Sequence, residues 1–160
     1  MAERLPAQAE ELFKEAYRRQ MAGELDEAIR LYKRSIATHP TAEAYTFLGW
    51  TYSVQGRIDL AIEHCKKAIA VDPDLGNPYN DIGAYLIQKG DFDDALPWLE
   101  QAKLAARYEP RHFPYLNAGR VRLARGELGP ALEEFRIARR LHKDDPLAGE
   151  MVRIIKKRLN

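Results

Sequence analysis

Four regularly spaced glycines divide the sequence into units of nearly equal length. They are separated by 33, 34 and 36 residues, at Gly23, Gly56, Gly90 and Gly126. An alanine follows each glycine at a distance of five residues, at Ala28, Ala61, Ala95 and Ala131. A small residue precedes each glycine by seven residues, at Ala16, Gly49, Gly83 and Gly119. Such a repeat predicts a solenoid, because a unit of this size buries its apolar face only against neighbouring copies.

Within each unit the apolar residues recur with helical spacing. In the second unit Tyr45, Leu48, Gly49 and Tyr52 follow the i, i+3, i+4, i+7 pattern of one helix face. Gly56 comes next, and glycine commonly ends a helix because it adopts the left-handed conformation without penalty. A second helical pattern follows the glycine, so each unit is predicted to be two antiparallel helices joined by a tight turn.

These residues resemble the tetratricopeptide repeat family, whose unit is a helix–turn–helix of about 34 residues. The second unit carries the motif at Tyr45, Leu48, Gly49, Tyr52, Gly56, Ala61, Ala68 and Pro73. The third carries it at Tyr79, Ile82, Gly83, Leu86, Gly90, Ala95, Leu99 and Ala102. The third unit has Arg107 in place of the usual closing proline and resumes at Pro110, which matches its two-residue insertion. The resemblance implies an all-α fold, a right-handed superhelical solenoid of four helix–turn–helix repeats.

The whole chain, residues 1–160, is predicted to form a single domain. Its repeats are expected at about 9–41, 42–75, 76–111 and 112–145, with a further helix at about 146–159. That last helix has an apolar face made of Leu147, Met151, Ile154, Ile155 and Leu159. An amphipathic helix in this place is predicted to cap the solenoid, with its charged face in water.

The composition favours a soluble protein and offers little for catalysis. Hydrophobic residues make up 46% of the chain and charged residues 31%, and no segment is predicted to span a membrane. The single cysteine, Cys65, stands at a predicted core position and has no intramolecular disulfide partner. The four histidines share no i, i+4 pair, so we expect them to be isolated at the surface or at helix ends: His39, His64, His112 and His142. We therefore expect a cytoplasmic protein that is not an enzyme and holds no cofactor or metal.

The net charge of +1 conceals a gradient along the chain. Residues 72–106 carry a net charge of −5, whereas residues 107–160 carry +6. One alternative function is therefore a structural assembly subunit that self-associates head to tail through its end repeats. Another is association with RNA or an anionic surface through residues 107–160. Aromatic residues are not interleaved with those arginines, so no specific nucleic acid is expected.

The family resemblance implies that the first helix of each repeat lines a concave peptide-binding groove. The residues expected there are Phe13, Tyr17, Phe47, Trp50, Asn77, Asn80, Asp81, Phe113, Asn117 and Arg120. Aromatic side chains bury a large area on binding, asparagine amides suit a peptide backbone, and arginine suits a carboxylate. An alternative for Phe13, Phe47 and Trp50 is packing between adjacent first helices.

The leading functional hypothesis is a non-catalytic adaptor that binds an extended or helical segment of a partner protein in this groove. Chaperone-binding members of the family hold a C-terminal carboxylate with a clamp of lysine, asparagine and arginine. The corresponding positions here are Phe13 and Tyr17, then Phe47, then Asn77 and Asp81. Starting one repeat later does not supply the clamp either. Binding to chaperone C-terminal tails is therefore not expected.

Overall fold

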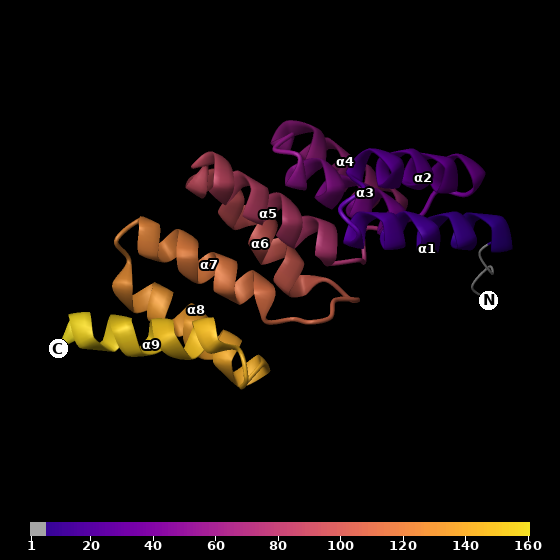
Figure 1. The fold of residues 1–160 in the computed structure, drawn as a ribbon. Helices are drawn as coiled ribbons and strands as arrows, with labels where there is room; N and C mark the ends of the chain where they lie inside the picture. Colours follow the sequence, from indigo (N-terminus) through magenta and orange to yellow (C-terminus); the bar gives the residue numbers. More distant parts are fainter. Residues whose placement is uncertain (1–5) are drawn as a thin grey trace.

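Residues 6–160, which the computed structural model describes, form nine α-helices and no β-strand (Figure 1). The helices are α1 (Ala7–Met21), α2 (Leu25–Thr38), α3 (Ala42–Val54), α4 (Ile58–Val71), α5 (Asn77–Lys89), α6 (Phe92–Leu104), α7 (Phe113–Ala124), α8 (Leu128–Leu141) and α9 (Pro146–Leu159). The first eight form four antiparallel pairs that follow one another from the N-terminus to the C-terminus, and α9 lies against α8. The predicted all-α solenoid is confirmed.

The tight turn inside each pair depends on its glycine. Gly90 has a φ of 85°, in the left-handed region that disfavours residues with a side chain. There its amide donates to the carbonyl of Ile87 at 2.9 Å, and the amide of Asp91 donates to the carbonyl of Leu86 at 2.8 Å. These two bonds satisfy carbonyls at the end of α5 and turn the chain into α6.

The two helices of each pair approach closely at the small residue predicted from the repeat. A Cβ built on Gly83 of α5 would lie 2.4 Å from a methyl carbon of Leu99 on α6. A Cβ on Gly119 of α7 would lie 2.7 Å from the ring of Phe135 on α8. Both Leu99 and Phe135 are completely buried, so each fills the space that the glycine leaves.

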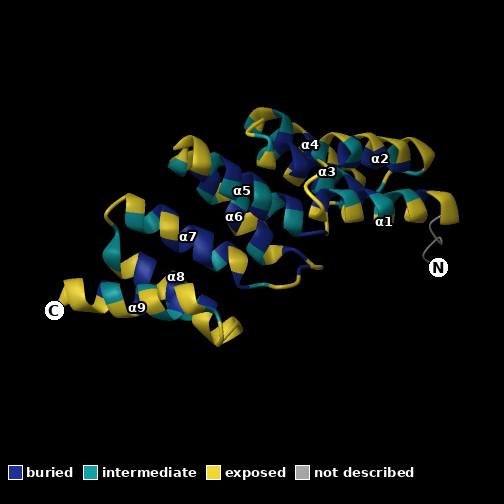
Figure 2. Cartoon of the chain, viewed as in Figure 1, coloured by how far each residue is buried: buried dark blue, intermediate teal, exposed yellow. Residues whose placement is uncertain are grey.

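Burial alternates around each helix, with the buried sides turned toward neighbouring helices (Figure 2). One core cluster joins α1 to α5, and a second joins α7, α8 and α9. In α9 the residues buried against this second cluster are Ala148, Val152 and Ile155. The predicted face was partly wrong, because Leu147 and Leu159 are exposed. The end helix packs on one side only, and so buries a stripe narrower than the apolar residues in its sequence.

Replacing Gly119 with alanine should destabilise the protein, because the new methyl group overlaps the buried Phe135 ring. We expect Gly119→Ala to lower the free energy of unfolding by about 1–3 kcal/mol, measured by urea unfolding followed by circular dichroism. Gly129→Ala is the matched control, since Gly129 lies in α8 with nothing within 4 Å of a new Cβ. The control should be neutral or up to about 1 kcal/mol more stable. Equal effects of the two substitutions would contradict the close approach.

Candidate functional site

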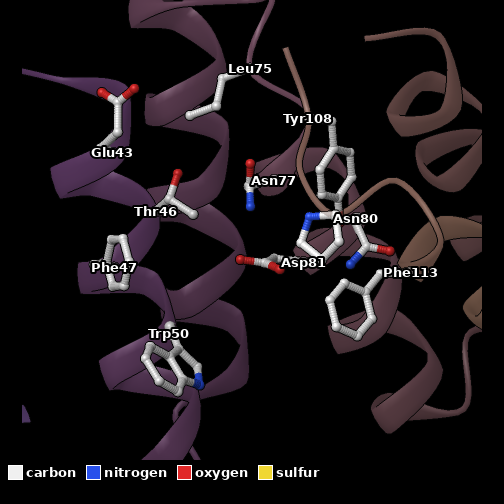
Figure 3. Close-up of a pocket in the computed structure, with 11 residues that line it drawn as sticks. Glu43, Thr46, Phe47, Trp50, Leu75, Asn77, Asn80, Asp81, Tyr108 and Phe113 are labelled. Atoms are coloured by element: carbon white, nitrogen blue, oxygen red, sulfur yellow. The ribbon is translucent and has the colours of Figure 1, made fainter. Parts of the chain in front are cut away.

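A hollow of about 580 Å³ lies across α3, α5 and the start of α7 (Figure 3). Its lining comes from three successive first helices, from the turn before α5 and from the connection before α7. The lining residues are Glu43, Thr46, Phe47, Trp50, Leu75, Asn77, Asn80, Asp81, Tyr108, Pro110 and Phe113. Six of the ten residues predicted for the groove are therefore brought together: Phe47, Trp50, Asn77, Asn80, Asp81 and Phe113.

Aromatic rings stand on both sides of this hollow. Trp50 and Phe47 project from α3, while Tyr108 and Phe113 face them from the connection and from α7 (Figure 3). Trp50 and Phe113 are 39% and 42% exposed, which is high for such large apolar side chains. Exposed rings gathered around a concavity are the side chains best suited to bury area against a ligand.

The aromatic wall continues beyond the hollow toward α1. The Phe47 ring lies 5.4 Å from Phe13, 5.7 Å from Tyr17 and 6.0 Å from Trp50, centroid to centroid. Phe13 is half-buried against the core, whereas Tyr17 is 42% exposed. Neither of these two predicted residues lines the hollow. Phe13 thus follows the alternative of packing between helices, and Phe47 both packs and lines the hollow.

A chain of polar contacts positions Asn80. The side-chain amide of Asn117 donates to Oδ1 of Asn80 at 2.9 Å, and Arg120 donates to Oδ1 of Asn117 at 3.0 Å. These bonds orient the Asn80 amide so that its NH₂ group stays available to the hollow. Asn117 and Arg120, which were predicted for the groove, do not line this hollow: Asn117 is buried against Asn80, and Arg120 is exposed and bonded to Asn117. Helical spacing predicted both residues to face inward, and it could not predict that Asn117 of α7 bonds to Asn80 of α5.

Asp81 projects from α5 into the middle of the hollow (Figure 3). Its carboxylate makes no hydrogen bond or ion pair with another residue of the described range 6–160. Burial raises the pKa of Asp81 from an ordinary value of 3.8 to about 7. The side chain is half-buried. An unpaired carboxylate in this place lowers the stability of the fold at neutral pH.

The far wall of the hollow is built by the connection between α6 and α7. The amide of Arg107 donates to the carbonyl of Asp74 at 3.0 Å, and the amide of Gly76 donates to the carbonyl of Arg107 at 2.8 Å. These bonds hold the ring of Tyr108 against Gly76, where a Cβ would lie 2.4 Å from the ring. Tyr108 and Pro110 were not predicted as site residues. Both lie at the two-residue insertion of the third repeat. That insertion was the one sequence feature that could have indicated a changed connection here.

Glu43, also not predicted, stands at the rim and is shared with the same connection. Its Oε1 lies 3.6 Å from a guanidinium nitrogen of Arg107, which also pairs with Asp72. The lining side chains therefore include two carboxylates, and none of those assigned to the hollow is basic. This distribution opposes binding of an anionic group there.

Two histidines predicted to be isolated lie together beside the site. The rings of His112 and His142 are 4.5 Å apart, and Nε2 of His112 lies 3.3 Å from Asp145. His112 is buried and stacks on Phe113, with ring centroids 4.3 Å apart. Both lie at helix ends, His112 as the N-cap of α7 and His142 as the C-cap of α8, but they are not isolated because the antiparallel packing of α7 and α8 brings these two ends together. Within the described residues no group of three or more His, Cys, Asp or Glu side chains is arranged to hold a metal ion.

Three family models of the tetratricopeptide repeat match this chain, at residues 7–43, 42–75 and 79–107. The chain belongs to the tetratricopeptide repeat family. It is 27% identical over 117 residues to Tetratricopeptide repeat protein 8 of Caenorhabditis elegans, covering 72% of this chain and 23% of that protein. The chain spans about a quarter of the length of the curated relatives that it matches.

Solved structures of tetratricopeptide repeat proteins share the fold. The structure of PilF from Pseudomonas aeruginosa superposes with a TM-score of 0.87 at 21% identity, covering 94% of this chain and 69% of that chain. The first tetratricopeptide domain of Spaghetti, bound to the HSP90 peptide SRMEEVD, has a TM-score of 0.68 at 22% identity and covers 74% of this chain and 93% of that chain. No helix in the part of the chain that the structure describes is both long and apolar enough to cross a lipid bilayer.

The raised pKa of Asp81 predicts a pH-dependent stability. The pKa of the Asp81 carboxyl is about 7 in the folded protein and 3.8 in the unfolded chain, so the folded protein binds the carboxyl proton more tightly. The free energy of unfolding therefore falls as the pH rises from 3.8 to about 7. We expect Asp81→Asn to raise the free energy of unfolding by about 2 kcal/mol at pH 8 and by much less at pH 4. The measurement is urea unfolding at both pH values.

Asp74→Asn is the matched control for this prediction. Asp74 lies in the turn before α5, is exposed and does not line the hollow. Its substitution removes the same charge without relieving a buried carboxylate, so it should have little effect at either pH. An Asp81→Asn effect that is the same at pH 4 and pH 8 would contradict the raised pKa.

Proposed function

We propose that this chain is a non-catalytic adaptor that holds a linear segment of another protein in the groove across α3, α5 and α7. The observation that carries the proposal is the hollow itself, with exposed Trp50 and Phe113 on opposite sides of Asp81. Aromatic residues in a concave surface are frequent binding hot spots. The proposed role requires no cofactor and no reaction at the site.

The groove matches an extended segment in both size and chemistry. Its volume of about 580 Å³ accommodates a few side chains rather than a folded domain. The free NH₂ group of Asn80 and the amide of Asn77 offer hydrogen bonds to the backbone of a segment laid across α5. The Spaghetti domain, which shares the fold, was solved with a peptide bound.

Chaperone C-terminal tails remain an unsuitable partner under this proposal. The peptide in the Spaghetti complex, SRMEEVD, contains three acidic residues. Here the positions that would clamp its carboxylate are aromatic, acidic or, at Asn77, an uncharged amide, and Asp81 stands in the hollow. Placing one carboxylate beside another without a cation is unfavourable.

Selection from a phage library of random linear 16-residue peptides tests the proposal. Peptides selected on the wild-type protein should lose affinity for Trp50→Ala and Phe113→Ala by about tenfold or more, because both rings lose buried contact. The control is Leu104→Ala, since Leu104 is 82% exposed and does not line the hollow. Isothermal titration calorimetry measures each affinity, and circular dichroism checks that the variants retain their helices.

Two results would contradict the adaptor role. The first is selection of peptides whose affinity is unchanged in both ring variants, which would place binding outside the groove. The second is the absence of selected peptides together with a mass, in sedimentation equilibrium, that rises with concentration and falls with added salt. That result would favour head-to-tail self-association between the oppositely charged regions 72–106 and 107–160.

A further inference from the structure

The charge inside the groove indicates what kind of side chain it selects. The two ionisable carboxyl groups that line the hollow, Glu43 and Asp81, differ in their surroundings. Glu43 is at the rim and has Arg107 within 3.6 Å. Asp81 is at the centre, and in the described structure no cationic side chain lies within ion-pair distance of it. The Asp81 carboxylate, which is the less solvated of the two, therefore has no cation beside it in the hollow.

Asp81 has no role in the fold that would explain its presence. It lies in the second turn of α5, so it does not cap the helix, and it forms no hydrogen bond with another side chain of residues 6–160. Burial raises its pKa, which means that the carboxylate opposes folding at neutral pH. A group that lowers stability and faces a binding surface is typical of a functional site.

The neighbouring side chains are suited to a long basic residue. Trp50, Tyr108 and Phe113 present rings around the same space as Asp81 (Figure 3). Arginine and lysine carry an apolar stem and a cationic head, so rings can cover the stem while a carboxylate pairs with the head. Residues 72–106, which include α5, carry a net charge of −5 and add attraction for a cation at longer range.

We propose that the groove selects a partner segment through a basic side chain, arginine or lysine, whose cationic head pairs with Asp81 between the rings of Trp50 and Phe113. This inference rests on the proposed function, because the basic side chain belongs to the linear segment held in the groove. It commits the groove to one class of partner, a segment of positive charge.

The peptide selection described above also tests this inference when it is repeated on Asp81→Asn. Peptides selected on the wild-type protein should share arginine or lysine at one position, and those selected on Asp81→Asn should not. Replacing that basic residue with glutamine in a synthetic peptide should lower its affinity for the wild type by about tenfold or more. The same replacement should change the affinity for Asp81→Asn by less than about twofold.

Asp74→Asn provides the charge control for this double-mutant cycle. It removes one negative charge from the same region, but its side chain does not line the hollow. The glutamine replacement should therefore cost as much affinity in Asp74→Asn as in the wild type. The glutamine replacement could instead cost equally little affinity in Asp81→Asn and in Asp74→Asn. The attraction would then be long-range, and the proposed direct pairing with Asp81 would be wrong.

The pH dependence of binding gives a second readout. Pairing requires the ionised form of Asp81, so affinity for a histidine-free peptide should fall about tenfold between pH 8 and pH 6. Asp81→Asn should remove this dependence. The titratable groups on which the charge of Asp81 acts are Cys65 of α4, Tyr85 of α5 and Tyr108 of the connection. Burial raises the pKa of each of them, so they stay neutral over this interval.

The other charged groups near the hollow are present in both proteins being compared. Glu43 of α3 lies at the rim, and Arg120 of α7 is bonded to Asn117. His112 and His64 do not line the hollow. A difference in pH dependence between the wild type and Asp81→Asn therefore isolates the Asp81 carboxyl.

The results separate failure of this inference from failure of the adaptor role. Peptides that require Trp50 and Phe113 but show no shared basic residue would overturn the basic-side-chain proposal and leave the adaptor role standing. An equal loss of affinity on glutamine replacement in the wild type and in Asp81→Asn would also overturn it. Peptides that bind independently of both rings would overturn both proposals.

Discussion

The architecture depends on the close approach of two helices at a small residue in each pair. Gly83 lies against Leu99, Gly119 against Phe135, and the backbone of Ala61 lies 3.0 Å from where a Cβ on Gly49 would be. Because the helices of a pair touch at these positions, the large residues around them are buried between the helices, and each first helix takes a fixed orientation. The spacing between α3, α5 and α7 follows, and with it the width of the groove.

The connection between α6 and α7 adds a wall to this regular surface and so makes an open hollow. In a regular repeat the chain would pass directly from the second helix to the next first helix. Here the backbone of Arg107 bonds to the turn before α5, and Tyr108 packs on Gly76. The added residues thus become a wall that faces Trp50 across the groove. This wall, which comes from a local departure from the repeat, distinguishes this groove from that of a regular repeat.

The helices were predicted well from the sequence because the same spacing of glycine, alanine and small residues recurs in all four units. The turn glycines, the small contact residues and the solenoid all follow from spacing alone, and the structure confirms them. The groove was predicted less completely. Asn117 was predicted to line the groove, but it is buried, bonds to Asn80 and does not line the hollow. Contacts of that kind join residues 37 positions apart, and no periodic pattern encodes them.

The same distinction applies to Tyr108 and to the histidine pair. The insertion after Arg107 indicated a departure from the repeat. The path of the inserted segment depends on hydrogen bonds to the Asp72–Gly76 turn, which the sequence does not show. His112 and His142 meet because α7 and α8 are antiparallel, which places the N-cap of α7 beside the C-cap of α8. Prediction from sequence therefore succeeded where a residue's place is set by its own helix, and failed where it is set by a contact between helices or by an irregular segment.

Electrostatics gives the groove its proposed selectivity, and Asp81 is the group on which it depends. Burial raises the pKa of its carboxyl, so the free protein favours the protonated form and a bound cationic side chain favours loss of the proton. The most direct measurement is the pKa of the Asp81 carboxyl by ¹³C NMR, in the free protein and with a selected basic peptide bound. We expect a pKa of about 7 in the free protein and a decrease of more than about one unit on binding. A pKa near 4 in the free protein, or one that the peptide leaves unchanged, would contradict the role assigned to Asp81.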